Sequence, residues 1–137
     1  MTAPDSALTR LSFKRDCKGV NWNAVKSLYR LAQFDNGRMP DVLRRAFEGS
    51  QRVCFIYTKP EGSLIGTARA ISDGVTCSAV FDVCVHPDWQ RSGVGTEMMR
   101  ILLSDLTGQF VLLTTPVPEF YLRLGFKKTG DAMWKVC

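Results

Sequence analysis

The first fifty residues combine one strand-like pattern with two helical ones. Apolar and polar residues alternate over 11–14, which predicts a short strand. Asn21 or Asn23 can cap a following helix, and a second helix begins after Pro40 and stops at Gly49. The apolar positions of the two helices recur at steps of three and four, which predicts one buried face on each: Val25, Leu28, Tyr29 and Ala32, then Val42, Leu43, Ala46 and Phe47.

The rest of the chain reads mainly as strands separated by turns. Segments 51–58 and 64–72 flank the turn Lys59-Pro60-Glu61-Gly62 and predict a hairpin, and Asp73-Gly74 marks a second turn. The remaining predicted elements are a strand over 76–85, a helix over 93–106, an apolar strand over 110–114 that we expect to be covered on both faces, a short helix over 116–124, and two closing strands at 126–127 and 133–136.

The resulting order, β-α-α-β-β-β-α-β-α-β-β, predicts an α/β protein with a mixed sheet flanked by helices. Most neighbouring strands are expected to be antiparallel, because hairpins connect them. One strand–helix–strand crossover makes two central strands parallel. A chain of 137 residues suffices for one domain with one core, so we expect residues 1–137 to form a single domain.

Composition narrows the class of protein. Hydrophobic residues make up 45% and charged residues 23%, which is typical of a globular protein. No apolar run is long enough to span a membrane and no secretion signal is recognised, so we expect a cytoplasmic protein. The five cysteines lack metal-site spacing, which favours free thiols and no metal. The net charge of +5 comes from scattered basic residues, a pattern that does not indicate nucleic-acid binding.

The segment from Val80 to Met99 carries the clearest chemical signal. An apolar strand ends at His86, a loop with two glycines follows, and a periodic helix begins. Such a loop presents unpaired backbone N–H groups and the positive end of a helix dipole to an anion, and glycine lets the backbone approach a phosphate closely. We interpret the loop as a diphosphate site, although a glycine turn by itself often serves only to reverse the chain.

A second motif, Phe120-Tyr121-Leu122-Arg123-Leu124-Gly125-Phe126, follows the first in the order of one family. With Gln90-x-x-Gly93-x-Gly95, it makes the chain resemble the GNAT superfamily of N-acetyltransferases, in its small single-domain form. The element order matches over about residues 10–136, and the motifs are specific over about 66–126. The segments 66–74 and 82–87 are also similar to arylalkylamine acetyltransferases.

The resemblance implies acetyl-CoA as the cofactor. Backbone N–H groups of the loop would hold its pyrophosphate, and the pantetheine would lie between the splayed fourth and fifth strands. One strand N–H would then stabilise the oxyanion of the tetrahedral intermediate. Many family members carry Asn where this chain has Thr114, seven residues before the tyrosine. The implied cofactor-binding residues are Val83, Cys84, Val85, Gln90, Arg91, Ser92, Gly93, Val94, Gly95, Thr96 and Thr114.

Two residues are candidates for the chemistry. The resemblance implies that Tyr121 is the general acid that protonates the departing thiolate, and the alternative is an ordinary half-buried aromatic residue. Asp82 is the candidate base, since a carboxylate in an apolar strand can have a raised pKa, and the alternative is that it pairs with an arginine. His86 before a proline is more often structural, and Cys84 more often a buried thiol than a nucleophile.

The connection between the two early helices would line the acceptor site by resemblance. Phe34, Asp35 and Arg38 are the expected contacts, with Asp35 attracting an ammonium and Phe34 covering an apolar group. These residues favour N-acetylation of a small primary amine such as an arylalkylamine, a polyamine or an amino sugar. The alternatives are acetylation of a protein amine or aminoacyl-tRNA, and a non-catalytic acyl-CoA-binding module. Pairing of 133–136 at a sheet edge would make a homodimer.

Overall fold

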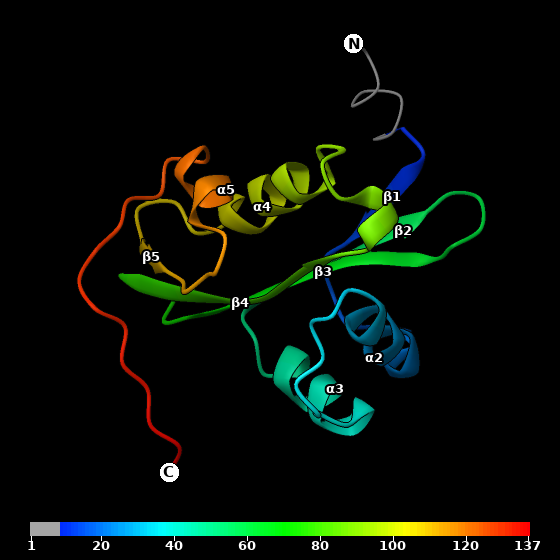
Figure 1. Ribbon diagram of the computed structural model, residues 1–137, viewed down its shortest axis with the longest axis horizontal. Coiled ribbons are helices and arrows are strands. Elements are labelled where there is room, and N and C mark those ends of the chain that lie inside the picture. The colour runs from blue at the N-terminus through cyan, green and yellow to red at the C-terminus, as the bar shows by residue number, and fades with distance from the viewer. Residues whose placement is uncertain (1–8) are drawn as a thin grey trace.

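The structure, a computed structural model, describes residues 9–137. This part of the chain forms one mixed sheet with the strand order β1-β2-β3-β4-β5, in which only β4 and β5 are parallel (Figure 1). The strands are β1 (Leu11–Lys14), β2 (Arg52–Thr58), β3 (Leu64–Ser72), β4 (Cys77–Val85) and β5 (Phe110–Leu112). The predicted mixed α/β architecture, with a single crossover through a helix, is therefore confirmed.

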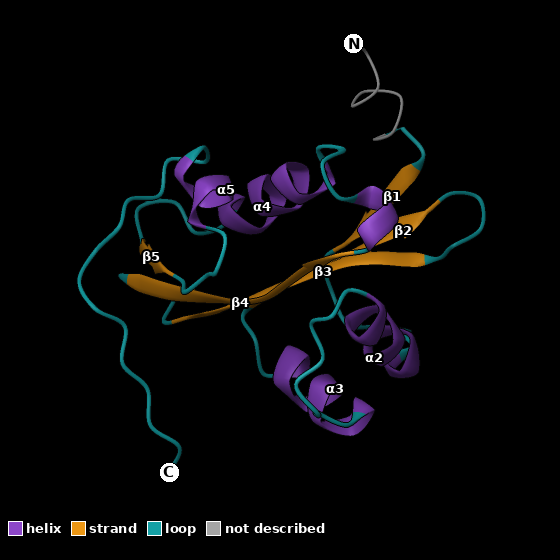
Figure 2. Ribbon diagram, in the orientation of Figure 1, coloured by secondary structure: helices purple, strands orange, loops and turns teal. Residues whose placement is uncertain are grey.

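Helices cover both faces of the sheet (Figure 2). The helices α2 (Trp22–Leu31) and α3 (Pro40–Glu48) lie on one face, and α4 (Val94–Ser104) and α5 (Pro118–Leu122) lie on the other. Asn21 is the cap of α2, and its side chain accepts a hydrogen bond from the Ala24 N–H at 3.1 Å. In α3, Leu43 and Phe47 are fully buried, but Val42 is exposed, contrary to the prediction.

Two apolar cores result from this arrangement. One lies under α4, where Met98 and Met99 pack with Ile56 of β2. The other lies under α2 and α3, where the rings of Phe47 and Phe55 are 5.2 Å apart. Both faces of β2 and β3 are therefore buried, and burial of this kind is the main favourable term in folding. The two strands support β4, which carries Asp82 and Val83 to Val85 of the predicted site.

The end of the chain departs from the prediction. The strand β5 ends at Leu112 rather than at residue 114, and Phe110 and Leu112 are exposed, so it is not covered on both faces. The predicted strands at 126–127 and 133–136 are not formed. A strand of three residues offers little edge for pairing, and Gly125 and Gly130 take positive φ angles of 93° and 52°, which turn the chain.

Candidate active site

The strands β4 and β5 separate soon after they begin. Their parallel pairing covers only Cys77 to Ala79 of β4, opposite Phe110 to Leu112 of β5. The strand β4 continues to Val85 with β3 on one side and no strand of the described chain on the other. The expected splayed pair is therefore present, and the second half of β4 has a free backbone edge.

The direction of the backbone N–H groups shows which of them face this free edge. The N–H of His86 donates to the Ile65 carbonyl of β3 at 2.7 Å, and Cys84 is the register partner of Thr67. Because successive N–H groups of a strand point to opposite sides, those of Val83 and Val85 face away from β3. Of the three residues expected to contact pantetheine, Cys84 therefore has its N–H directed toward β3. Its thiol is buried, and burial raises its pKa to about 12, which argues against a nucleophile.

A β-bulge interrupts β4 beside the free edge. Thr67 pairs with Cys84 and Arg69 with Phe81, so Ala68 lies opposite two residues, Asp82 and Val83. Asp82 has a φ of 54°, in the left-handed region that residues other than glycine rarely occupy. The sequence pattern gave no sign of this bulge. It alters the alternation of β4 at the point where the N–H of Val83 turns toward the free edge.

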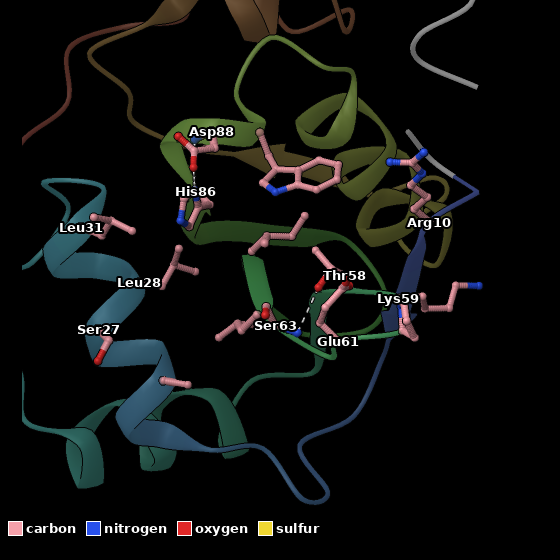
Figure 3. A pocket seen from close by; sticks show the side chains of 15 residues that line it. Arg10, Ser27, Leu28, Leu31, Thr58, Lys59, Glu61, Ser63, His86 and Asp88 are labelled. Atoms are coloured by element: carbon pink, nitrogen blue, oxygen red, sulfur yellow. Dashed lines mark hydrogen bonds and ion pairs between the residues drawn. The ribbon is translucent and has the colours of Figure 1, made fainter. Parts of the chain in front are cut away.

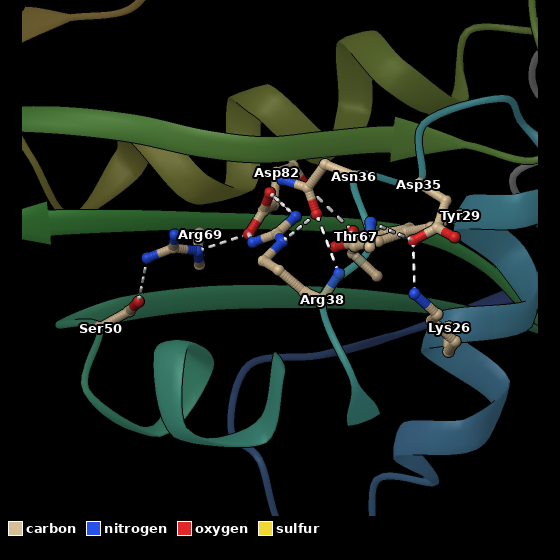
Figure 4. A network of polar contacts seen from close by, with 10 residues as sticks. Lys26, Tyr29, Asp35, Asn36, Arg38, Ser50, Thr67, Arg69 and Asp82 are labelled. Atoms are coloured by element: carbon tan, nitrogen blue, oxygen red, sulfur yellow. Dashed lines mark hydrogen bonds and ion pairs between the residues drawn. The ribbon is translucent and has the colours of Figure 1, made fainter. Parts of the chain in front are cut away.

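The Asp82 carboxylate is held by two arginines (Figure 4). Arg38 donates to both of its oxygens at 2.9 and 2.7 Å, and Arg69 Nε donates to Oδ2 at 2.7 Å. Burial alone would raise the pKa of Asp82, but the hydrogen bonds from Arg38 and Arg69 outweigh it and hold that pKa below its usual value. The expectation of a raised pKa was wrong, and the alternative of pairing with arginine is what the structure contains.

Sequence reasoning did not assign a role to Arg69 or to the hydroxyl chain beneath Asp82. Thr67 Oγ1 donates to the Asp82 carbonyl at 2.9 Å, so Tyr29 must donate its hydroxyl hydrogen to Thr67 over 2.8 Å. One signal was available in the sequence. Arg69 and Asp82 are opposite charges within two otherwise apolar strands that were predicted to be neighbours, and buried opposite charges are usually paired.

The loop after β4 is shaped by its own side chains. His86 Nδ1 accepts from the Asp88 N–H at 3.0 Å and starts the 3-10 turn Pro87–Trp89, which supports the structural interpretation of this histidine. Gln90 Nε2 donates to the Val85 carbonyl at 3.0 Å, and Ser92 Oγ donates to the Trp89 carbonyl. Gln90 and Ser92 therefore fix the loop through their side chains, which leaves the backbone N–H groups after Gln90 to meet a ligand.

The helix α4 begins at the end of this loop without a side-chain cap. Gly93 is its N-cap residue with a φ of 88°, and Arg91 also has a positive φ of 63°. The Glu97 N–H makes the bond to the Gly93 carbonyl, so the N–H groups of Val94, Gly95 and Thr96 precede the first such bond. Together with the helix dipole, these N–H groups can bind an anion, and the diphosphate site at this loop stays a prediction.

The second motif packs directly on this helix terminus. A Cβ atom added to Gly95 would lie 3.3 Å from Phe120 Cζ and 3.8 Å from Val85 Cγ2, so a larger residue here would require Phe120 to shift by a few tenths of an ångström. The adjacent Tyr121 is buried between Phe120 and Phe126, with ring centroids 4.9 and 5.7 Å away. The fold thus brings together the two motifs that are 25 residues or more apart in the sequence, at the end of β4.

The Tyr121 hydroxyl makes no hydrogen bond to the described residues. In residues 9–137 no fully buried polar side-chain atom lacks a partner, so this oxygen lies at an accessible surface. Burial of the ring raises the pKa of Tyr121, which keeps the phenol protonated near neutral pH. An unpartnered, protonated hydroxyl suits a proton donor.

Thr114, the remaining predicted cofactor residue, follows β5 and is exposed. The next residue, Thr115, accepts from the Val117 N–H at 3.0 Å.

The predicted acceptor residues lie in the connection between α2 and α3, beside the Asp82 cluster. Phe34 is partly exposed, and its ring meets Tyr29 edge-on at 5.0 Å. Asp35 binds Lys26 Nζ at 2.6 Å, so its carboxylate already has an ammonium partner from the same chain. Arg38 reaches across to Asp82, which ties this connection to β4.

Two cavities of the described chain are lined by residues other than the predicted acceptor contacts Phe34, Asp35 and Arg38. A cavity of about 820 Å³ opens between α2 and the β2–β3 turn, with Leu28, Thr58 and His86 in its wall (Figure 3). A second, of about 780 Å³, lies along β5 and α5 and includes Tyr121.

None of the helices within 9–137 has the length and apolar character to cross a membrane, and the same residues contain no cluster of three metal-ligating side chains.

Comparison with known proteins identifies relatives. Residues 50–128 match a family model described as "Acetyltransferase (GNAT) domain". Serotonin N-acetyltransferase 2, chloroplastic, from Oryza sativa subsp. japonica is 34% identical over 94% of this chain and 68% of its own length. A GNAT family acetyltransferase from Streptococcus pneumoniae TIGR4 has a TM-score of 0.75 at 23% identity, covering 92% and 98% of the two chains.

A solved complex resembles the chain in fold alone. AAC(6')-Iy, bound to the bisubstrate analog CoA-S-monomethyl-acetylneamine, has a TM-score of 0.67 at 15% identity and covers 93% of this chain and 99% of that one. That protein therefore holds a CoA derivative on the same fold.

Proposed function

The chain belongs to the GNAT family of N-acetyltransferases, and from this premise we propose that it transfers the acetyl group of acetyl-CoA to a primary amine of a small molecule. The observation that carries the proposal is the meeting of three features at one place. The uncapped start of α4 and the end of the free edge of β4 meet Phe120 at Gly95, and the ring of Phe120 contacts Tyr121, whose hydroxyl has no partner in the described chain.

The proposed cofactor site uses the backbone. N–H groups of residues 91–96 hold the pyrophosphate, with Arg91 and Thr96 exposed nearby for a side-chain contact. The pantetheine amides bind along the free edge of β4, at Val83 and Val85, and Thr114 borders the gap from the end of β5. Bound acetyl-CoA supplies the thioester whose carbonyl carbon is attacked. AAC(6')-Iy, which has the same fold, binds a CoA derivative, and this supports acetyl-CoA as the cofactor.

In the proposed reaction the unprotonated acceptor nitrogen attacks the acetyl carbon. The carbonyl oxygen becomes an oxyanion, which accepts a hydrogen bond from the N–H of Val83. Collapse of the intermediate breaks the C–S bond, Tyr121 donates its proton to the CoA thiolate, and the amine proton leaves to water. Water then returns one proton to the Tyr121 phenolate, which restores the acid. Because two arginines hold Asp82 in its charged form with a lowered pKa, we assign proton removal to water rather than to this carboxylate.

The acceptor is proposed to enter beside the α2–α3 connection. Phe34 offers an exposed ring edge for an aromatic or alkyl group, and Arg38 borders β4 at the point where the acetyl group would lie. We do not assign Asp35 a direct contact with the acceptor ammonium, because Lys26 pairs with one of its oxygens and Arg30 lies 3.7 Å from the other. An arylalkylamine is the favoured class, since the rice relative is named a serotonin N-acetyltransferase.

Release of free thiol from acetyl-CoA tests the proposal. The purified protein is assayed with an arylalkylamine, a polyamine and an amino sugar, and acetyl-CoA binding is measured separately by calorimetry. We expect binding, and release above the buffer rate with at least one amine. Binding without release would instead support a non-catalytic acyl-CoA-binding module, and release only with a peptide or aminoacyl-tRNA would support a macromolecular acceptor.

We further propose that the chain forms a homodimer through its C-terminal segment. Met133, Trp134 and Val136 are 91, 88 and 84% exposed, and β5 has no strand on its outer edge in the described chain. Apolar side chains and an open strand edge are both costly in water. Sedimentation should therefore give a dimer for the whole chain and a monomer for Trp134→Asp; a monomer for both would refute the assembly.

The free thiols support a proposal about the location. All five cysteines are free, which fits a reducing compartment, and we propose the cytoplasm. The rice relative is named as chloroplastic, and the stroma is the alternative that a fractionation experiment would detect.

A further inference from the structure

The bulge in β4 holds a residue in an unfavourable conformation. Asp82 has a Cβ atom and a φ of 54°, and a left-handed conformation costs free energy for any residue other than glycine. Such strain persists only where the surrounding structure enforces it. The contacts that hold Asp82 in this conformation come from β3 and from the connection between α2 and α3.

Two groups of contacts fix Asp82, one through its side chain and one through its backbone. Its carboxylate is 8% exposed and receives three hydrogen bonds from Arg38 and Arg69. Its carbonyl accepts from Thr67, which in turn accepts from Tyr29 of α2. Arg69 is itself held by Ser50 at 3.3 Å, and Arg38 Nε donates to Asn36 at 2.7 Å (Figure 4).

The position of the bulge gives this cluster a consequence for catalysis. The next residue, Val83, is the first of the two whose N–H faces the free edge of β4. The Val83 N–H belongs to the peptide group that joins Asp82 to Val83, so the backbone angles of Asp82 set the tilt of that peptide plane and the aim of its N–H. The direction of this donor therefore depends on the conformation of Asp82.

We propose that Asp82 is a positioning residue, and that its ion pairs with Arg38 and Arg69 hold the bulge that aims the Val83 N–H at the acetyl carbonyl. This inference rests on the proposed function. Arg38 extends the effect to the acceptor side, because it joins the α2–α3 connection to the same carboxylate. A change in that connection alters the oxyanion donor without touching the cofactor.

Replacement of Asp82 by glycine and by alanine separates this role from that of a base. Both substitutions remove the carboxylate and leave the same two arginines unpaired, but only glycine adopts a positive φ without steric cost. Loss of one oxyanion donor typically costs about 10²- to 10³-fold in kcat. We therefore expect Asp82→Ala to lose on the order of 10²-fold in kcat, with Asp82→Gly and Asp82→Asn retaining clearly more, and all three binding acetyl-CoA equally.

The outcomes are distinguishable. Equal loss of kcat in all three variants, with loss of the acidic limb of the pH profile, would identify Asp82 as the base and overturn the inference. Equal kcat in the alanine and glycine variants, with only thermal stability reduced, would overturn it as well. Arg38→Gln is expected to lower kcat at unchanged acetyl-CoA affinity. Arg45→Gln, an exposed arginine of α3, is the matched control and should behave as the unsubstituted protein.

A structural measurement decides the inference even if the enzyme assay finds no acceptor. Crystal structures of the variants should show the bulge retained in Asp82→Gly and lost or rearranged in Asp82→Ala. A positive φ at residue 82 in the alanine variant would show that the arginines are not needed to hold the bulge. Failure of the unsubstituted protein to bind acetyl-CoA would count against the proposed function alone.

Discussion

The contact between Gly95 and Phe120 predicts a coupled pair of substitutions. A Cβ atom at residue 95 would lie 3.3 Å from Phe120 Cζ and 3.5 Å from Cε1, closer than an unstrained packing allows. Replacing glycine by alanine in a helix stabilises by at most about 1 kcal/mol, whereas overpacking costs about 1–3 kcal/mol. We therefore expect Gly95→Ala to lower the free energy of unfolding by about 0–2 kcal/mol.

The effect on turnover should be larger than the effect on stability, because Phe120 adjoins Tyr121. Phe120→Leu shortens the side chain that clashes, so the double variant should recover stability relative to the sum of the single changes. A cycle of urea unfolding on the four proteins measures this coupling, and thiol release measures kcat. If Gly95→Ala stabilises the protein and retains kcat, the close packing of Gly95 against Phe120 is refuted.

Three further predictions concern single groups. Tyr121→Phe should lower kcat by about 10²- to 10⁴-fold while calorimetry gives an unchanged acetyl-CoA affinity; equal losses in both would refute the acid role. Because the folded pKa of Asp82 lies below its unfolded value, its stabilising contribution is present above about pH 4 and is lost as pH falls through the folded pKa. The difference in unfolding free energy between the unsubstituted protein and Asp82→Asn should therefore shrink in acid, and a difference independent of pH would contradict the ion pairs. Iodoacetamide at pH 8 should modify the exposed Cys77 and Cys137 and spare Cys84, whose raised pKa and burial protect it, as mass spectrometry of peptides would show.

The sequence predicted those parts of the fold that depend on local patterns. The Asn21 cap, the buried pair Leu43 and Phe47, and the glycine loop before α4 each follow from residues a few positions apart. The strand predicted at 133–136 is not formed. Such a strand requires a partner edge, and β5 supplies only three residues. A local apolar pattern carries no information about whether such an edge exists.

The candidate site was predictable in part for the same reason. The loop at 90–95 and Tyr121 lie within recognisable motifs, and the fold brings them together through Gly95. The environment of Asp82 was mispredicted because its partners lie 44 and 13 residues away in sequence, and an apolar neighbourhood alone suggested a raised pKa. The bulge was missed because a register shift between two strands leaves no trace in the pattern of one.

Titration of the ¹⁵N-labelled protein with acetyl-CoA tests the central claim most directly, because amide chemical shifts report where the cofactor lies. We predict that the largest shifts fall on the amides of residues 91–96, with Val83 and Val85 next and Asp35 unaffected. Shifts confined to the wall of the 820 Å³ cavity, at residues 58–65, would place the ligand on the other side of β4 and contradict the proposed site.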